Sequence, residues 1–318
     1  MTKSAVIVGG SAGVGRAVLS QLMDRGYRVG VIARGHERLT EISEAYGAQV
    51  VTRSVDASKS EDIDEAAAEL VGELGEPDVW VNCAMATVFA PFRDVTNEEF
   101  ERVTDVTYLG QVNGARAAFR HMSRGNIVFI GSGLSYRSVP GQSAYCGAKH
   151  AINGFVSSVR SELMQENSKL VLSLVQLPAI NTPQFDWARS RLSKKPQPAP
   201  PIFSPHVAAA GVMRAIDTDA REVIVGRSVL QLIFGNMILP NWLDKKMAES
   251  GTEAQKSERP PEDSLDNLMS PAPYPAKAEG SYGDRAEQSG LIIDGDKARC
   301  ILLMAGLGIP FLLGLILG

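Results

Sequence analysis

A glycine-rich turn near the amino terminus constrains the fold more than any other feature of the sequence. The apolar run Ala5 to Val8 leads into Gly-Gly-Ser-Ala-Gly-Val-Gly, residues 9–15, and a helical spacing of apolar residues follows. This order predicts a buried strand, a tight turn and a helix. The turn lets the backbone approach a pyrophosphate, which then faces the positive end of the helix dipole. The expected pyrophosphate-binding residues are Gly9, Ser11, Ala12, Gly13, Val14 and Gly15.

The alternative for this turn is a glycine-rich connection that binds no ligand, and the organisation of the chain argues against it. Strand-like apolar runs near residues 5, 29, 50, 79, 127, 171 and 223 alternate with helical patterns. Such alternation predicts an α/β fold, a doubly wound parallel sheet of the Rossmann type with helices on both faces. A glycine-rich turn after the first strand of such a series is typical of dinucleotide binding.

A tyrosine and a lysine four residues apart are candidates for acid–base chemistry. If the segment from Ala144 onward is helical, Tyr145 and Lys149 share one helix face. A free tyrosine titrates near about 10, so proton exchange at neutral pH needs the phenolate favoured by about 3 to 4 kcal/mol, which a close cation can supply. The spacing alone is weak evidence, because two common residue types recur at this separation by chance.

Ser132 strengthens this interpretation by its place in the chain. Asn126 to Ile130 has the composition of a short buried strand, and Ser132 follows it. Its hydroxyl is therefore expected at the carboxyl end of the strand, the edge at which ligands bind in open α/β sheets. The alternative is a turn serine that bonds its own backbone.

The end of the second expected strand indicates which dinucleotide is bound. Residues 28–33 are followed by Arg34, with no acidic residue where Asp or Glu would hold a ribose 2′-hydroxyl. Arg34 suits a 2′-phosphate instead, and Arg38 either assists it or is a solvated surface charge. The sequence therefore favours NADP(H) over NAD(H).

Together these motifs resemble the short-chain dehydrogenase/reductase family, from about residue 4 to about residue 226. The Gly-x-x-x-Gly-x-Gly spacing is that of the family's common short form rather than its extended, epimerase-like branch. The resemblance implies that Tyr145 is the general acid/base, that Lys149 lowers its pKa and holds the nicotinamide ribose, and that Ser132 steadies the substrate oxygen. It also implies cofactor contacts from Asp56 at the adenine, from Asn82 and Ala84 after the fourth strand, and from Pro178, Ile180 and Thr182 beside the nicotinamide.

The chain departs from the family's pattern at a few positions. Cys83, Met85 and Ala179 replace the usual Asn, Gly and Gly, which is expected to alter packing more than chemistry. Thr107 stands where the family usually has an asparagine that helps hold a proton-relaying water near the lysine. Thr107 is therefore a fourth catalytic candidate: either its hydroxyl binds that water, or the relay runs differently.

The composition excludes other classes of function. A net charge of −4 and a pI near 5.7 leave no basic stripe for a nucleic acid. Three cysteines and four histidines are scattered without metal-ligand spacing, so no metal site is expected and a reduced, cytosolic setting fits. By resemblance, a long helix from Glu98 to Met122 would form part of a homodimer or homotetramer interface.

The chain changes character after Gly226. Residues 227–248 form an apolar extension of the catalytic domain, residues 1–248, and are expected to pack on the core as helix, although they could also cover the pocket or rest against a membrane. Residues 249–296 are rich in Pro, Ser, Glu, Ala and Gly, which predicts a disordered linker.

The carboxyl-terminal segment predicts a membrane anchor over residues 297–318. Cys300 to Gly318 contains no charged residue, and as a helix with a rise of about 1.5 Å per residue it would span the hydrocarbon of a bilayer. The alternative is a core or oligomer-interface helix. Lys297 and Arg299 at its entrance, with no amino-terminal signal peptide, place the catalytic domain on the cytosolic side.

The sequence as a whole predicts a membrane-tethered, NADP(H)-dependent oxidoreductase that moves a hydride between nicotinamide and a carbonyl or alcohol carbon. Aromatic residues within 182–203, where the family places its substrate lid, and the tether both favour a lipophilic substrate. The alternative is a catalytically silent NADP-binding scaffold or sensor, against which the intact Ser132, Tyr145 and Lys149 argue.

Overall fold

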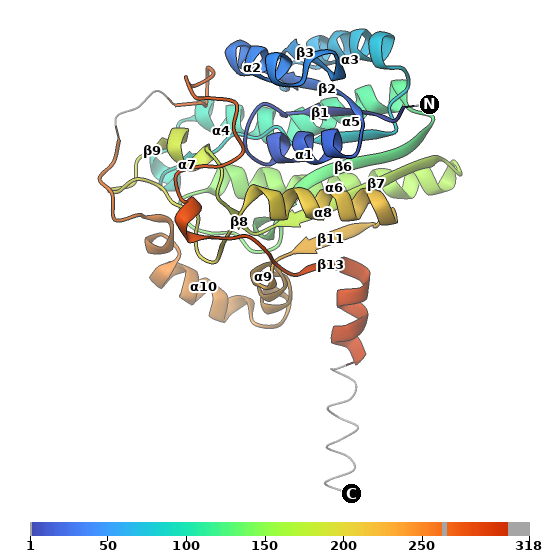
Figure 1. Cartoon of the computed structure of the whole chain (residues 1–318). Coiled ribbons are helices and arrows are strands. Elements are labelled where there is room, and N and C mark those ends of the chain that lie inside the picture. Colours follow the sequence, from blue (N-terminus) through green and yellow to red (C-terminus); the bar gives the residue numbers. More distant parts are fainter. Residues whose placement is uncertain (1, 263–265, 305–318) are drawn as a thin grey trace, which may run out of the picture.

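The computed structural model describes residues 2–262 and 266–304. Its centre is an eight-stranded sheet in the order β13-β11-β7-β6-β4-β1-β2-β3 (Figure 1). The strands are β1 (Ser4–Val8), β2 (Arg28–Ala33), β3 (Val50–Ser54), β4 (Val79–Asn82), β6 (Arg124–Ser132), β7 (Lys169–Leu177), β11 (Glu222–Val225) and β13 (Ile292–Asp294). All neighbours pair in parallel except β13, which is antiparallel to β11. The seven strands expected from the sequence are therefore present, and the doubly wound parallel sheet is confirmed.

Helices cover both faces of the sheet because its central strands are apolar on both sides. In β1, Ala5 and Ile7 belong to one core cluster, while Val6 and Val8 belong to the other. The first cluster includes α1 (Gly13–Asp24), α2 (His36–Tyr46) and α8 (Pro205–Thr218); the second includes α3 (Ser60–Leu74), α5 (Gly110–His121) and α6 (Ser143–Gln165). Successive side chains along one strand therefore pack into two different hydrophobic cores, one on each face of the sheet.

The strand order places a ligand edge at the carboxyl end of β1. That strand pairs with β2 on one side and with β4 on the other, so the chain reverses its direction of travel across the sheet between them. Ligands of open α/β sheets bind at such a switch point. The glycine turn and the ends of β4 and β6 all meet this edge.

The long helix expected from Glu98 to Met122 contains an interruption. It is built from α4 (Asn97–Thr104), a π turn η3 (Asp105–Leu109) and α5. A capping box between Thr96 and Glu99 starts it, because each residue's side chain accepts a hydrogen bond from the other's backbone amide. The π turn contains Thr107, the position at which the sequence departs from the family's pattern.

Short elements surround the ligand edge. They are α7 (Gln184–Trp187), the strands β8 (Ala179–Ile180), β10 (Ile202–Phe203) and β12 (Ala286–Glu287) of a three-stranded sheet, and the strands β5 (Val88–Phe89) and β9 (Arg189–Ser190) of a two-stranded sheet. The apolar extension forms α9 (Arg227–Ile238) and α10 (Pro240–Ser250). Val229 and Ile233 bury one face of α9, while α10 buries Leu243.

The expectation of a disordered linker over residues 249–296 is wrong for the residues that the structure describes there. This stretch carries the turns η5 (Glu253–Gln255) and η6 (Gly283–Arg285) and the strands β12 and β13, and β13 completes the edge of the central sheet. Its composition is poor in bulky apolar residues. It is held instead by pairing of its backbone with the domain, together with a few buried side chains such as Leu268 and Tyr282.

The predicted anchor falls largely outside the described residues. A helix begins at Gly295 and continues to Met304, while residues 305–318 are not described. Among the helices within residues 2–262 and 266–304, none is both long enough and apolar enough to cross a bilayer.

Candidate functional site

A cavity of about 820 Å³ lies at the carboxyl ends of the central strands. It brings together most of the residues that the sequence singled out: Gly9, Ser11, Ala12, Gly13, Val14, Arg34, Asp56, Ala84, Ser132, Tyr145, Lys149, Pro178, Ile180 and Thr182 line it. Three candidates, Gly15, Asn82 and Thr107, are not among its lining residues. Arg38, which the sequence left as either a helper of Arg34 or a solvated surface charge, also lines the cavity.

Two glycines of the turn lie so close to neighbouring backbone that neither position has room for a Cβ atom. Gly9 has a φ of +89°, and a Cβ there would lie 2.5 Å from the Ala84 nitrogen. A Cβ at Gly15 would lie 2.1 Å from the Gly9 carbonyl oxygen, so Gly15 shapes the turn without lining the cavity. No side chain caps α1. The Gly13 amide donates to the Lys277 carbonyl and the Gly15 amide to the Cys83 sulfur, so the Val14 amide is the first-turn donor that an anion could reach. The turn therefore fits a dinucleotide pyrophosphate.

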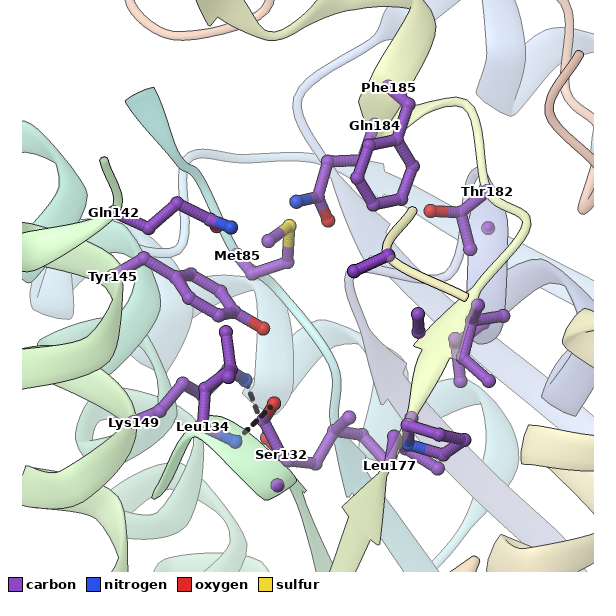
Figure 2. A pocket seen from close by; sticks show the side chains of 18 of the residues that line it. Met85, Ser132, Leu134, Gln142, Tyr145, Lys149, Leu177, Thr182, Gln184 and Phe185 are labelled. Atoms are coloured by element: carbon purple, nitrogen blue, oxygen red, sulfur yellow. Dashed lines mark hydrogen bonds between the residues drawn. The ribbon is translucent and has the colours of Figure 1, made fainter. Parts of the chain in front are cut away.

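Tyr145 and Ser132 approach the cavity from different elements. Tyr145 lies in the first turn of α6 and Ser132 ends β6, and Figure 2 shows both hydroxyl groups pointing into the same space. The Ser132 hydroxyl accepts a hydrogen bond from the Leu134 amide at 3.1 Å, which leaves its hydrogen free to donate to a substrate oxygen. The alternative that the sequence left open, a turn serine that bonds its own backbone, accounts for the hydrogen bond that this hydroxyl accepts. It does not account for the hydrogen that the hydroxyl can still donate.

Burial raises the pKa of the Tyr145 phenol above its ordinary value; Cys146 adds to this shift, while the Ser132 hydroxyl opposes it. The lowered pKa that the family resemblance implied is therefore not what these surroundings produce. The phenol keeps its proton at neutral pH, which is the form that can protonate a carbonyl oxygen.

Lys149 is a buried cation beside this phenol. Its ammonium donates to the Ile130 carbonyl at 2.6 Å and lies 5.6 Å from the centre of the Tyr145 ring. Burial lowers the pKa of Lys149 to about 8. Gln111 also donates to the Ile130 carbonyl, at 3.2 Å. Sequence reasoning missed Gln111, whose place four residues after Thr107 on a helix was the only available signal.

Thr107 is fully buried and serves the backbone. Its hydroxyl donates to the Ala86 carbonyl and accepts from the Ala86 amide, both at 2.9 Å. The side chain thus fixes the loop that carries Met85 into the cavity. A part in the proton relay stays a prediction, since the structure does not bring this hydroxyl to the cavity wall. Asn82 is buried in the same way, with its side-chain oxygen accepting from the Trp80 indole at 3.2 Å.

We expect Thr107→Val to lower the free energy of unfolding by about 2 kcal/mol or more, because it leaves the buried amide and carbonyl of Ala86 without a partner. Thermal or denaturant unfolding measures this. Thr104→Val is the matched control, since the Thr104 hydroxyl bonds only a carbonyl of its own helix. Equal stability of the two variants would contradict the structural role given to Thr107.

The segment 266–283, here called the strap, lies against the end of the cavity where Arg34 and Asp56 are expected to meet the adenosine of the cofactor. Arg34 donates to three of its carbonyls, those of Asn267 at 2.5 Å and of Leu268 and Met269 at 3.2 Å each. Further hydrogen bonds to strap carbonyls come from Arg38 to those of Ala272 (2.7 Å) and Tyr274 (3.4 Å), from Arg102 to that of Leu268 (3.0 Å), and from the Gly13 amide to that of Lys277 (3.1 Å). The guanidinium groups expected to meet a 2′-phosphate therefore also hold the strap.

The charges at this end favour an anion. Arg34 lies 4.0 Å from the Asp56 carboxylate, which pairs more closely with Arg102 at 2.5 Å. Burial acts to raise the pKa of Asp56, but hydrogen bonds from Arg102 and Ser58 outweigh it and lower that pKa. Burial, with Arg102 nearby, lowers the pKa of Arg34. One carboxylate thus faces two guanidinium groups.

The opposite end of the cavity is mainly apolar. Its walls include Leu134, Val139, Phe185, Leu232, Trp242, Leu243 and Met247. Gln142 is a polar residue of this wall (Figure 2). Its side-chain amide donates to the Gln255 side chain at 2.6 Å and thereby ties the wall to the segment that follows α10. Neither glutamine was singled out from the sequence, because no motif marks them. Across the described residues, no cluster of three His, Cys, Asp or Glu side chains could hold a metal ion.

Residues 3–191 match the family model described as short chain dehydrogenase. The chain is 29% identical over 263 residues to the uncharacterized oxidoreductase YxnA of Bacillus subtilis, which covers 80% of this chain and 74% of that protein. It is 32% identical over 173 residues to carbonyl reductase family member 4 of Xenopus tropicalis, and this alignment covers 54% of this chain and 73% of that protein. The crystal structure of a short-chain dehydrogenase from Streptomyces avermitilis has the same fold, with a TM-score of 0.66, 24% identity, and coverage of 78% of this chain and 96% of that one.

Proposed function

The chain belongs to the short-chain dehydrogenase family of NAD(P)-dependent oxidoreductases, and we propose that it uses NADP(H) to interconvert a lipophilic carbonyl compound and its alcohol. The observation that carries this proposal is the convergence of Ser132, Tyr145 and Lys149 in one cavity with the glycine turn. The apolar wall of that cavity supports a lipophilic substrate.

The residues of the cavity divide the chemistry between them. NADP(H), when bound along the glycine turn, supplies or accepts the hydride. Tyr145 donates its proton to the substrate oxygen during reduction, and its raised pKa suits this direction. Ser132 donates a hydrogen bond to the same oxygen. Lys149 provides positive charge that stabilises the phenolate left behind.

A substrate series tests the activity. Purified protein is assayed with NADPH and a series of ketones of increasing apolar size, and in the reverse direction with NADP⁺ and the corresponding alcohols. We expect kcat/KM to rise along the series, because each added methylene buried in the cavity contributes about 0.8 kcal/mol of binding. Turnover that is strongest with small polar carbonyls would contradict the lipophilic assignment.

We expect Arg34→Ala to lower kcat/KM for NADPH by about tenfold or more and that for NADH by less than about threefold, because a guanidinium can pair with the 2′-phosphate that only NADPH carries. Steady-state kinetics with both cofactors measure this. Glu41→Ala is the matched control: the Glu41 carboxylate accepts a hydrogen bond from the Ala276 amide of the strap but does not line the cavity. An equal loss with both cofactors in both variants would assign Arg34 to the strap alone and contradict the NADP(H) preference.

The carboxyl-terminal anchor is proposed on the sequence of residues 297–318, with the catalytic domain on the cytosolic side. Membrane fractionation after a carbonate wash, which strips peripheral proteins, compares the full chain with a variant that ends at residue 296. We expect only the full chain to stay with the membranes. Release of both would overturn the anchor.

A further inference from the structure

An exposed apolar corner joins α9 to α10. All six residues from Met237 to Trp242, with the sequence Met-Ile-Leu-Pro-Asn-Trp, are exposed. The exposed fraction is 67% for Met237, 62% for Ile238, and 54% for both Leu239 and Trp242. Single exposed apolar residues are common on proteins, but a contiguous group of large ones marks an interaction surface. We call residues 237–242 the apolar corner.

A second exposed apolar group lies on the same side of the molecule. The helix that begins at Gly295 packs on α9, because its Ala298 shares a buried cluster with Val229 and Ile233. Its further residues Ile301, Leu303 and Met304 are exposed. Figure 1 shows α9, α10 and this helix together at the bottom of the view. The chain leaves the described structure here with fourteen more residues, 305–318, none of them charged.

Positive charge borders the apolar corner. Lys245 and Lys246 are exposed on α10, and the Lys246 ammonium lies 5.1 Å from the centre of the Trp242 ring. Lys297 is exposed on the carboxyl-terminal helix. Of the nearby acids on α10, Asp244 pairs with Arg137 at 2.7 Å, which leaves Glu249 as the other exposed carboxylate of that helix. Lysines beside tryptophan and aliphatic residues are typical of surfaces that bind anionic lipid.

The corner is also connected to the cavity. Trp242, Leu243, Lys246 and Met247 line the cavity wall, and the first of these belongs to the apolar corner. A surface seated at the corner would therefore meet the apolar end of the cavity directly. A water-soluble substrate would gain nothing from this arrangement, whereas a lipid-soluble one could pass between a bilayer and the cavity without crossing water.

We propose that the apolar corner is a membrane-docking surface that inserts into the boundary between the headgroups and acyl chains of an anionic bilayer. The occupant is a bilayer rather than a second copy of the chain, because an uncharged segment leaves the structure on the same side of the molecule and lysines border the corner. The docking surface stands independently of the activity; only its use as a substrate entrance rests on the proposed function.

Tryptophan fluorescence tests the docking. The full chain is mixed with vesicles of phosphatidylcholine and phosphatidylserine whose acyl chains carry bromine at defined depths. Of the three tryptophans, Trp80 is fully buried in the core and Trp187 is half-buried against Tyr274, so an acyl-chain quencher would act mainly on the exposed Trp242. With bromine at shallow positions of the acyl chains, we expect the fluorescence of Trp242 to fall at least twofold. The Trp242→Phe variant should not show this loss.

A matched pair of variants completes the test. Met237→Glu is expected to lower the bromine quenching of Trp242 at least twofold, whereas Met164→Glu, at a methionine that is 70% exposed on α6, leaves it unchanged. Neither methionine lines the cavity. Absence of quenching while the protein still floats with vesicles would overturn the docking surface, as would a change of oligomeric state in Met237→Glu without a change in quenching. Turnover of a water-soluble ketone, measured on the same samples, shows separately whether the proposed activity holds.

Discussion

Tyr145→Phe is expected to lower kcat for carbonyl reduction by about 10²- to 10⁴-fold while NADPH binding stays within about twofold of the wild type. The change removes only the hydroxyl that protonates the substrate oxygen, and a positioned proton donor contributes about this much to rate. The ring remains to fill its place in the cavity wall. Steady-state kinetics give kcat, and quenching of the protein's fluorescence by NADPH gives the dissociation constant.

Tyr136→Phe is the matched control for this variant. The Tyr136 hydroxyl donates to buried Glu222 at 2.5 Å but does not line the cavity. We expect this control to keep its turnover and to lose stability. If Tyr145→Phe turned over at the wild-type rate, the phenol would not be the proton donor. If the wild type itself bound NADPH but reduced no carbonyl, the silent scaffold would be the better description.

Lys149→Met is expected to separate activity from stability. We expect kcat to fall by about 10²-fold or more, because the cation that stabilises the Tyr145 phenolate is lost. At neutral pH the free energy of unfolding should rise by about 1 to 3 kcal/mol, since the variant no longer buries a charge. Methionine has a similar length, and the Ile130 carbonyl keeps Gln111 as a donor.

The pH dependence of stability distinguishes this explanation from better packing. Burial lowers the pKa of Lys149 to about 8 in the folded state, below its ordinary value of 10.5. Between these two values the unfolded chain binds more protons than the folded one, so the wild type gains stability as the pH rises from about 8 toward about 10.5. The methionine variant lacks this gain. Denaturant unfolding at pH 7 and pH 10 should therefore show the difference between them shrink; a constant difference would contradict the buried charge as its cause.

The sequence was sufficient for the parts of the fold that side-chain patterns specify. The seven apolar runs correspond to seven strands, since a strand covered on both faces must be apolar along its whole length. The glycine turn, Ser132, Tyr145 and Lys149 were found because each has a chemical reason for its residue type. Their meeting in one cavity follows from the strand order, which places the ends of β1, β4 and β6 at a common edge.

The strap shows where such reasoning fails. Its composition resembles that of disordered segments, yet its backbone carbonyls accept hydrogen bonds from Arg34 and Arg38. Backbone groups are the same in every residue, so no composition reveals that they will be used. Farther along the predicted linker, residues 291–293 form the apolar run Leu-Ile-Ile, and its two isoleucines belong to β13. The position of Thr107 in the sequence marked it as a departure from the family's pattern, but the sequence did not show that its hydroxyl bonds the backbone of Ala86.

Transfer of deuterium from labelled cofactor tests the central claim most directly. Purified protein is incubated with NADPH that carries deuterium on the transferable face of the nicotinamide C4, together with the best ketone of the substrate series. Mass spectrometry of the alcohol should find one deuterium at the carbinol carbon with the wild type, and product at background level with Tyr145→Phe. NADPH binding without labelled alcohol from any carbonyl in the series would contradict the assignment of this cavity as a hydride-transfer site.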